Sequence, residues 1–315
     1  MRIVGSGALN LDFFYQVEDI SSLESVKLSP GGERWGSRRE FEKLREELEK
    51  KGRFIAKSGG GSAANTIYAL KSWGFQTAFI GIVGKDQEGD EILAELEGVE
   101  LSRVLREGES ACCLIVLDAR KDRAIFVSPH SRETALKDFR IRISSREWLH
   151  LSSLITDEGF SFHLRLKEEH AGPVSVDPGE IYARRGASGI ISLLRGSKII
   201  FLTHQELSLL GLQPDKLSEL AEWVFLKKGA QGATLLNGKS CPIPPVPAEK
   251  LVDNTGAGDV FNAGVLAGIL KGLDPHSAGK LGAHLAAISL RDYGRKGYPT
   301  REEFEKWIKS YCLQT

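Results

Sequence analysis

Two kinds of apolar pattern alternate along most of the chain. Short apolar runs predict buried strands, whereas apolar residues that recur every three to four positions predict helices. Strands are expected at residues 77–83, 111–117, 123–127, 147–152, 173–177, 198–202, 223–227 and 232–236. Helices are expected at residues 88–96, 160–170, 187–195, 205–210, 215–222, 256–271, 275–292 and 300–311. This alternation predicts an α/β fold in which helices cover both faces of a mainly parallel sheet.

The first 60 residues depart from this alternation. A short apolar strand begins at residues 3–4, and residues 9–17 then alternate apolar with polar side chains, which predicts a half-buried strand. Residues 18–36 contain clusters of Ser, Pro and Gly and predict a loop. We expect about 13–59 to form a small lid with a helical insertion, within a single domain that spans 1–315.

A charged helix is expected over residues 37–51. Ser37 and Glu40 form a capping box at its start. One narrow face of this helix is apolar and suits covering either the lid sheet or a second subunit, so we predict a homodimer built partly from lid elements. The apolar face consists of Phe41, Leu44 and Leu48.

Composition excludes several classes of protein. Of the 315 residues, 41% are hydrophobic and 27% are charged, as in ordinary globular proteins. Lys and Arg together number 42, as do Asp and Glu, and this balance argues against a general nucleic-acid-binding protein. No apolar stretch approaches the ~20 residues of a membrane helix, and the N-terminus lacks the pattern of a signal peptide. We therefore expect a cytoplasmic protein that binds neither nucleic acid nor membrane.

The strongest chemical signal is the segment 253–259, DNTGAGD, which leads directly into an apolar helix. The backbone N–H groups of Gly256, Ala257 and Gly258 can point at one anion, typically a phosphate, and the helix dipole favours negative charge there. A carboxylate at Asp259 repels that anion, unless it orients a hydroxyl that attacks the phosphorus. The alternative is that Asp259 is an ordinary first-turn acid and the glycines only allow close packing.

An early glycine pattern, Gly5-x-Gly7-x-x-Asn10, resembles a dinucleotide-binding fingerprint. That fingerprint requires a helix immediately afterwards. Here an alternating strand follows and Asn10 replaces the third glycine, so we reject the dinucleotide interpretation. Asn10 and Asp12 lie on the same strand face and suit hydrogen bonds to a polyol; the alternative is that both are solvated on an edge strand.

A second glycine-rich helix start lies at residues 59–61, before a helix expected to begin with Ser62 as its N-cap. It suits either an anion or the close approach of a small ligand to the backbone. The alternative is a flexible connector.

Other polar residues follow strands and are candidates for nucleotide and metal binding. Lys227, Gly229 and Gly232 suit contacts to nucleotide phosphates, although a surface turn explains them equally well. Glu206 and Asp177 lie at the ends of two other strands, where a carboxylate can hold Mg²⁺ through water. Helix capping is the competing role for both acids.

Together these segments resemble the PfkB (ribokinase-like) family of carbohydrate and nucleoside kinases, in the right order over nearly the whole chain. The amino-terminal family pattern is matched by residues 60–65, by Gly74 and by residues 81–89. The carboxy-terminal pattern D-T-x-G-A-G-D-x-F is matched by residues 253–261, and residues 10–12 lie where the family places ligands of substrate hydroxyls.

The resemblance implies a ribokinase-like, doubly wound sheet with a small β lid over the substrate. It implies phosphoryl transfer from a nucleotide, usually ATP with ADP left open, to a hydroxyl of a sugar or nucleoside. Mg²⁺ is expected, and many members also use a monovalent cation such as K⁺ near the nucleotide. Asp259 would be the base, with an anion hole formed by Gly256, Ala257 and Gly258. The implied substrate contacts are Asn10, Asp12, Gly60, Gly61 and Asn65, and the implied nucleotide contacts are Lys227, Gly229, Gly232 and Asp253.

The sequence also departs from the family pattern. Asn254 replaces the usual Thr, and the N-x-x-E magnesium motif appears as Thr203-x-x-Glu206, so magnesium is expected to be held mainly through water. The lid is longer than usual, and its arginines suit either a substrate phosphate or solvent. Three functions therefore stay open: a sugar kinase, a nucleoside or sugar-phosphate kinase, and a catalytically silent regulator that binds sugar or nucleotide. The arginines are Arg34, Arg38 and Arg39.

Overall fold

The structure is a computed structural model that describes residues 1–120 and 122–312. Within these residues, the main sheet has nine strands. From one edge to the other they are β14 (Ser240–Ile243), β13 (Ala233–Leu236), β12 (Ala221–Lys227), β11 (Ser197–Thr203), β10 (Val174–Asp177), β9 (Trp148–Ser152), β1 (Ile3–Ser6), β5 (Thr77–Val83) and β6 (Glu100–Arg106). All adjacent pairs from β12 to β6 are parallel, and only the hairpin strands β13 and β14 pair in the antiparallel sense. The expected, mainly parallel sheet is confirmed.

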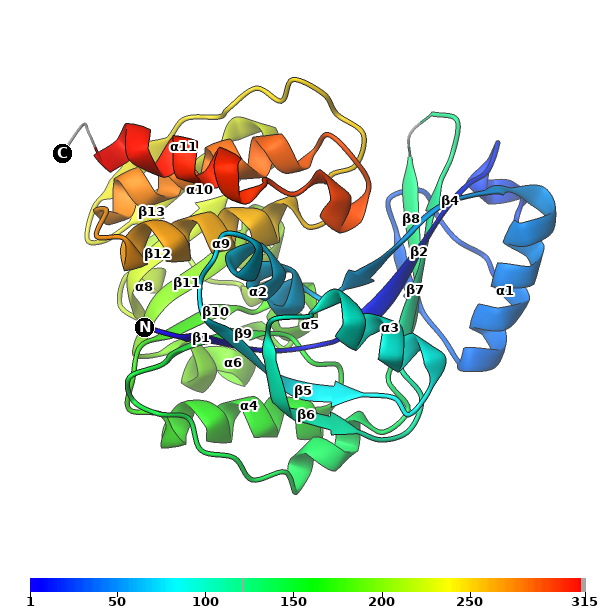
Figure 1. The fold of residues 1–315 in the computed structure, drawn as a ribbon, viewed down its shortest axis with the longest axis horizontal. Helices are drawn as coiled ribbons and strands as arrows, with labels where there is room; N and C mark the ends of the chain where they lie inside the picture. The colour runs from blue at the N-terminus through cyan, green and yellow to red at the C-terminus, as the bar shows by residue number, and fades with distance from the viewer. Residues whose placement is uncertain (121, 313–315) are drawn as a thin grey trace.

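Helices cover both faces of the main sheet (Figure 1). One layer contains α2 (Ser62–Ser72), α9 (Ala257–Leu270), α10 (Pro275–Ser289) and α11 (Arg301–Cys312). The other layer contains α4 (Asp157–Glu169), α5 (Gly179–Ala183), α6 (Gly186–Leu194), α7 (His204–Leu210) and α8 (Pro214–Leu217). Successive strand residues belong to opposite layers, as Phe201 packs in the first core while Ile200 and Leu202 pack in the second. No helix in the described ranges is both long and apolar enough to cross a membrane.

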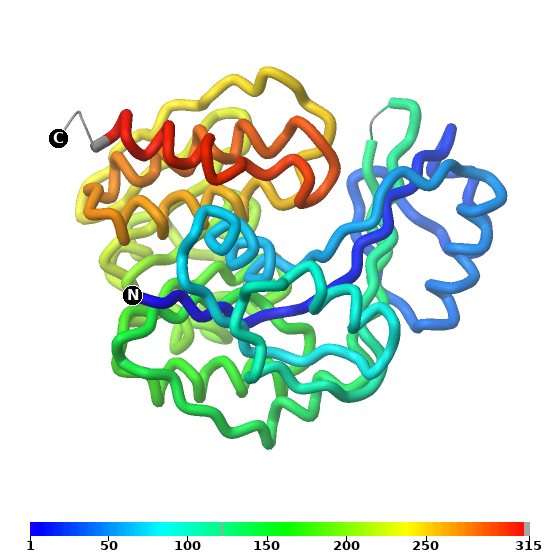
Figure 2. The backbone as a smooth tube through the Cα atoms, viewed as in Figure 1, coloured from blue at the N-terminus to red at the C-terminus, as the bar shows by residue number. Residues whose placement is uncertain are grey.

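A second sheet stands apart from the main sheet (Figure 1). Its strands lie in the order β3 (Glu33–Trp35), β8 (Arg123–Ser128), β7 (Ala111–Leu117), β2 (Asn10–Gln16) and β4 (Arg53–Gly60). We call this sheet together with α1 (Arg38–Lys51) the lid. Figure 2 shows the N-terminal chain running from β1 in the main sheet directly into β2. Because β7 and β8 also belong to this sheet, it draws on two chain segments and extends beyond the expected range 13–59.

Helix α1 covers one face of the lid sheet. The expected capping box is present, with Ser37 accepting the N–H of Glu40 and the Glu40 side chain accepting the N–H of Ser37. The predicted apolar face of the helix is fully buried within this single chain, and the Phe41 ring packs edge-on against Phe13 with centroids 6.0 Å apart. The helix therefore packs its apolar face against the lid sheet of the same chain, and this face is not available to a second chain.

The opposite face of the lid sheet looks toward the main body. Asp12, Phe14 and Ile115 are buried on this face, and the Phe14 ring contacts Tyr293 of the main body at 5.8 Å between centroids. Strand β2 was expected to be half-buried, but it is buried on both faces, because α1 covers one face and the main body approaches the other.

Several local predictions were wrong or incomplete. The helix expected over 215–222 ends at Leu217, because the chain from Ala221 onward pairs with β11. The N-cap of α2 is Gly61 rather than Ser62. The pattern did not predict β3, β4, β6, β14 or α5. The helix expected at residues 88–96 is present as α3 (Gln87–Glu95). Short 3₁₀ helices that were not predicted lie at Ile20–Ser22, Glu133–Lys137, Gly229–Gln231 and Gly294–Gly297.

Candidate active site

The expected site residues gather at the edge of the main sheet where the parallel strands end. In open α/β sheets, ligands bind outside the carboxyl ends of the strands. Here β10 ends at Asp177, β11 at Thr203 and β12 at Lys227, and these three strands are neighbours. The start of α9 reaches the same edge, since a β-carbon at Gly258 would lie 3.4 Å from Lys227 Nζ. The start of α2 adjoins it through the hydrogen bond between Asn65 and Asp259.

Asp259 is a buried carboxylate in the first turn of α9, with 8% of the residue exposed. Its Oδ2 accepts a hydrogen bond of 2.9 Å from Asn65 Nδ2. Burial raises the pKa of Asp259 to about 7, and the nearby charge of Asp177 adds to this rise. A carboxylate with a pKa near neutrality can accept a proton from a hydroxyl and release it again at physiological pH.

The start of α9 offers unpaired backbone donors beside this carboxylate. Gly256 is the N-cap, with a φ of 79°, and no side chain caps the helix. Within the described part of the chain, the N–H groups of Gly256 and Gly258 have no hydrogen-bond acceptor, whereas the N–H of Ala257 donates to the carbonyl of Asn254 at 3.3 Å. A left-handed φ at the N-cap suits glycine alone among ordinary residues. Of the three expected anion-hole residues, two thus present free donors.

Asn65 lies between two charged groups. While its Nδ2 donates to Asp259, its Oδ1 accepts a hydrogen bond of 3.1 Å from Arg295 Nε. The Arg295 guanidinium is buried, also donates to Glu95 at 3.0 Å, and lies 4.8 Å from the ring centre of Tyr68. An amide that is held at both ends cannot rotate, so Arg295 fixes which atom of Asn65 faces Asp259.

Asp12 reaches the site from the lid. It is 7% exposed, and its Oδ1 has no hydrogen-bond partner among the described residues. Burial raises the pKa of Asp12 to about 7, although a contact with Cys113 and the charge of Arg295 act in the opposite direction. Gly60 is required beside it, because a β-carbon at this position would overlap Asp12 Oδ2. A buried acid with an unpaired oxygen is suited to accept a hydrogen bond from a ligand hydroxyl.

Two further expected substrate contacts frame Asp12 and Asn65. Asn10 is partly buried and pairs with Gly60 in the lid sheet. Gly61 begins α2 with a φ of 95°, and a β-carbon there would overlap the carbonyl oxygen of Ala8. The backbone of the glycine run is therefore closely packed against its neighbours.

The expected nucleotide contacts do not all lie together. A cavity of about 640 Å³ opens at the ends of β11 and β12. Lys227 and Gly229 line this cavity. Gly232 does not line it but lies in a turn, with a φ of 83°, packed against the backbone of Ile243. Asp253 holds its own loop, because it accepts the N–H of Thr255 at 2.9 Å and, through Oδ2, the N–H of Gly294 at 3.0 Å.

The two acids expected to hold magnesium through water also accept hydrogen bonds from protein groups. Both Asp177 oxygens have protein partners, since Lys227 Nζ and Asn262 Nδ2 donate to Oδ2 and the N–H of Gly179 donates to Oδ1. Glu206 accepts the N–H of Thr203 at 2.7 Å and completes a capping box, which is the competing role considered for it. In residues 1–120 and 122–312, no three His, Cys, Asp or Glu side chains are grouped to hold a metal ion.

Of the three lid arginines that suit a substrate phosphate, Arg38 and Arg34 are paired with other protein groups. Arg38 bonds Cys112 and Glu88 on the α1 side of the lid, and Arg34 pairs with Glu40. Arg39 belongs to the same helix α1.

A different lid arginine faces the main body. Arg123 Nη1 donates to Asn254 Oδ1 at 3.1 Å and to Thr255 Oγ1 at 3.0 Å, immediately before the anion hole. A cavity of about 980 Å³ separates this part of the lid from the main body, and Arg123, Asn254 and Tyr293 all line it.

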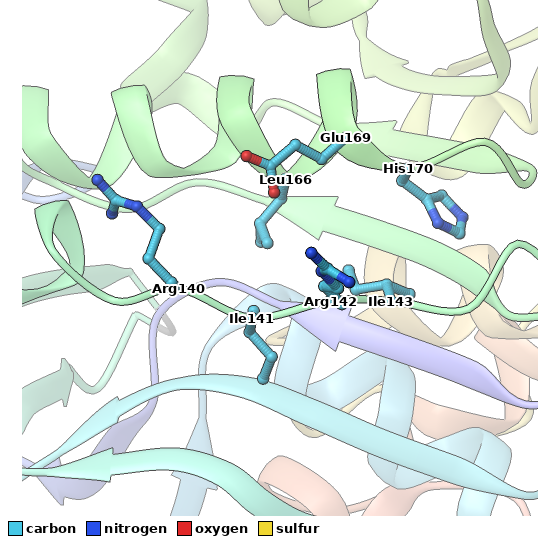
Figure 3. Close-up of a pocket in the computed structure, with 7 residues that line it drawn as sticks. All are labelled: Arg140, Ile141, Arg142, Ile143, Leu166, Glu169 and His170. Atoms are coloured by element: carbon cyan, nitrogen blue, oxygen red, sulfur yellow. The ribbon is translucent and has the colours of Figure 1, made fainter.

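Another cavity, of about 600 Å³, lies between the segment 140–143 and the end of α4 (Figure 3). These residues precede β9 and β10, so this cavity lies at the amino ends of the strands, opposite the site. Its lining consists of Arg140, Ile141, Arg142, Ile143, Leu166, Glu169 and His170.

Sequence reasoning missed Arg295, Arg123, Cys113 and Asn262. Only Asn262 carried a local signal, because it follows Asp259 by three residues and therefore lies one turn further along the same helix. Arg295 and Arg123 look like surface charges in the sequence, and their partners lie more than 130 residues away.

Comparison with known proteins identifies the family of this chain. The family model described as pfkB family carbohydrate kinase matches residues 37–301. An uncharacterized sugar kinase from Archaeoglobus fulgidus is 37% identical over 246 residues, which cover 73% of this chain and 98% of that protein. A nucleoside kinase from Methanocaldococcus jannaschii is 25% identical over 268 residues, covering 81% of this chain and 86% of that protein. The solved structure of a probable sugar kinase from Rhizobium etli has the same fold, with a TM-score of 0.81, 20% identity and coverage of 99% of this chain and 98% of that one. This chain therefore belongs to the pfkB family of carbohydrate kinases and is a phosphotransferase that acts on an alcohol group.

Proposed function

We propose that this protein transfers the γ-phosphoryl group of ATP to a hydroxyl of a sugar or nucleoside, with Asp259 as the base. The observation that carries this proposal is the position of Asp259, a buried carboxylate with a pKa of about 7 beside the free N–H groups of Gly256 and Gly258. An acceptor hydroxyl that donates to Asp259 lies within reach of a phosphoryl group held by those N–H groups. Positioning and charge neutralisation supply most of the catalysis in such reactions.

Each neighbouring side chain has one task in this proposal. Asn65 holds Asp259 through its amide, and Arg295 holds Asn65. Asp12 accepts a hydrogen bond from a second hydroxyl of the acceptor through its unpaired Oδ1. The donor lies over the cavity at the ends of β11 and β12, which Lys228 and Gly229 line. In this proposal Mg²⁺ binds together with the donor, as the MgATP complex. K⁺ acts as an activator, and its effect is measured by replacing it with Na⁺.

The charges of the acceptor pocket favour a neutral acceptor over a sugar phosphate. The guanidinium of Arg295 is already paired with Glu95 at 3.0 Å. Asp12 adds a second carboxylate to the same pocket, and a carboxylate repels a substrate phosphate. Arg38 is paired with Glu88 of α3 and Arg34 with Glu40 of α1, so both of these arginines already have an acidic partner.

We also propose that the lid closes over the acceptor and that two copies of the chain pair through the edges of the lid sheets. Because α1 uses its apolar stripe internally, support for the homodimer comes from Trp35 and Phe54, which are 41% and 52% exposed. They lie on the two edge strands of the lid sheet, β3 and β4. Light scattering at micromolar concentration should give twice the mass of one chain, and the mass of one chain would contradict the pairing.

A product assay tests the proposed activity. The protein is incubated with ATP and a panel of free sugars, sugar phosphates and nucleosides, and products are identified by phosphorus NMR. We expect a phosphorylated neutral acceptor. Binding of sugar and ATP without any product would favour the silent regulator, and turnover of sugar phosphates alone would contradict the neutral pocket.

A further inference from the structure

A cluster of buried charges underlies the anion hole. Asp177 ends β10, Lys227 ends the second strand along, β12, and Glu206 lies in the first turn of α7, which follows the strand between them. Lys227 Nζ forms a salt bridge of 2.7 Å to Asp177 Oδ2, and the two side chains are only 12% and 5% exposed. Buried ion pairs are costly to maintain unless their geometry is good, so such a pair at a candidate site calls for a role.

The lysine ammonium lies directly against Asp177, one of the two acids expected to hold a metal ion. Both carboxylate oxygens of Asp177 accept hydrogen bonds, from Lys227, Asn262 and Gly179. Glu206 caps its own helix by accepting the N–H of Thr203. Burial alone raises the pKa of Asp177, but the Lys227 ammonium outweighs this effect and lowers it. A second cation that approached this pair directly would have to displace the ammonium.

The free side of the ammonium faces the helix start. A lysine ammonium has three N–H donors, and Asp177 and Asn262 accept two of them, at 2.7 and 3.5 Å. A β-carbon at Gly258 would lie 3.4 Å from Lys227 Nζ, with no other group between them in the described structure. Burial lowers the pKa of Lys227, yet the charges of Asp177 and Glu206 raise it overall, so the group stays charged.

We propose that the Lys227 ammonium is the resident cation that neutralises the transferring phosphoryl group, in place of a metal ion bound directly by Asp177 and Glu206. This inference rests on the proposed kinase function. In the transfer, the acceptor oxygen bonds to phosphorus, the bond from phosphorus to the bridging oxygen breaks, and ADP leaves with the electron pair. The hydroxyl proton passes to Asp259, while Lys227 donates a hydrogen bond to a non-bridging oxygen and keeps its protons.

The same cluster accounts for a departure in the sequence. The first position of the N-x-x-E magnesium motif is Thr203 in this chain instead of an asparagine, and this threonine caps α7. Thr203 and Lys227 are direct partners in the pairing of β11 with β12. The loss of an uncharged magnesium-motif residue and the presence of a cation therefore occur side by side, as expected if one replaces the other.

Two variants separate the charge of Lys227 from its contribution to folding. Lys227→Met leaves Asp177 as a buried, unpaired charge, which is expected to destabilise the fold. In the double variant Lys227→Met/Asp177→Asn the unpaired charge of Asp177 is removed as well, and the amide oxygen introduced on β10 can still accept from Asn262, so we expect thermal stability close to that of the wild type. Loss of one preorganised donor typically costs ~10²–10³ in turnover, so the double variant should lose that much kcat. Lys239→Met, in the exposed turn between β13 and β14, is the matched control.

Metal binding gives a readout that does not depend on turnover. Mn²⁺ is titrated into the protein without nucleotide and followed by the EPR signal of the free ion. We expect no binding to the wild type or the double variant, and binding to Lys227→Met, in which the ammonium no longer neutralises Asp177. The inference is overturned if the double variant keeps wild-type kcat, or if the wild type binds Mn²⁺ and Asp177→Asn abolishes that binding. A wild type without turnover on any acceptor contradicts the proposed function. The Mn²⁺ titration then still tests whether the Lys227 ammonium keeps a metal ion from binding to Asp177.

Discussion

Two buried acids reach the candidate site from different parts of the molecule, Asp12 from the lid and Asp259 from the helix layer of the main body. Both have a pKa of about 7, and burial is the main cause in each case. Their hydrogen bonds differ, because Asp259 is held by Asn65 beside free N–H groups, whereas Asp12 Oδ1 has no partner in the described structure. A raised pKa therefore marks both acids as functional candidates, and only their partners distinguish the base from the binding group.

The two regions also differ in how they are built. The main body places its site residues at the ends of parallel strands and at a helix start, which fix backbone positions closely. The lid presents Asp12 from a strand that is covered by α1 on one face and meets the main body on the other, where Arg123 and Phe14 are among the contacting residues. We expect changes in the main body to act on the chemical step and changes in the lid to act on acceptor binding.

The largest expected effect comes from Asp259→Asn. This substitution keeps the shape of the side chain and removes the charge that accepts the hydroxyl proton. Loss of a general base typically lowers the rate by ~10²–10⁴, so kcat should fall by that factor. Nucleotide affinity, measured by calorimetry, should be unchanged. Turnover close to that of the wild type would contradict the assignment of Asp259 as the base.

Asp12→Ala should act on the acceptor instead. A hydrogen bond to a charged group contributes about 1.5–3 kcal/mol, so kcat/KM for the acceptor should fall roughly 10- to 100-fold. The fall should appear mainly in KM, and the Kd for ATP should be unaffected. If ATP affinity falls and acceptor KM does not, the lid strand lines the nucleotide side and the proposed layout is reversed.

The features that the sequence predicted correctly are local ones. The helix start at residues 256–259 and the glycine run at residues 59–61 each combine small residues, a helix and a polar group within a few positions. The capping box of α1 is equally local, since Ser37 and Glu40 are three residues apart. Such signals need no knowledge of the tertiary fold, because neighbours in the sequence remain neighbours in space.

The features that the sequence did not predict depend on distant partners. Lys227 and Asp177 are 50 residues apart, and Arg295 and Asn65 are 230 apart. A lysine after a strand looks like a surface charge until three strand ends pack around it. Strand β6 was missed for a related reason: it is an edge strand with half-exposed, charged residues, so its apolar pattern is weak.

The pH dependence of stability should distinguish Asp259→Asn from the wild type in a second way. The ordinary pKa of an aspartate is 3.8, and that of folded Asp259 is about 7. Between these values the unfolded carboxyl is ionised while the folded one keeps its proton, so this group lowers wild-type stability as pH rises through that window. Asn does not ionise, and the variant should be more stable than the wild type above pH 7, by on the order of a few kcal/mol. Urea unfolding at pH 8 and at pH 4 measures this; equal differences at both pH values would contradict the raised pKa.

The smallest expected effect comes from the contact between lid and body. Arg123→Ala removes two hydrogen bonds to Asn254 and Thr255, each worth roughly 0.5–1.5 kcal/mol at most. In the wild type, acceptor and nucleotide should slow hydrogen exchange across residues 10–58, and the variant should show less protection and a modestly higher acceptor KM. Lys51→Ala, on the far side of α1, is the control. Unchanged exchange in the wild type on saturation would show that the lid does not close.

The pH profile of kcat tests the central claim most directly, when it is measured for the wild type and for Asp12→Ala between about pH 5 and pH 9. Asp259 accepts a proton only when it is ionised, and its pKa is about 7. The account predicts that kcat falls below a midpoint near pH 7 in both proteins, because removing Asp12 leaves Asp259 as the titrating group. A kcat that stays constant across this range in the wild type, or that loses its acidic limb in Asp12→Ala, would contradict Asp259 as the base.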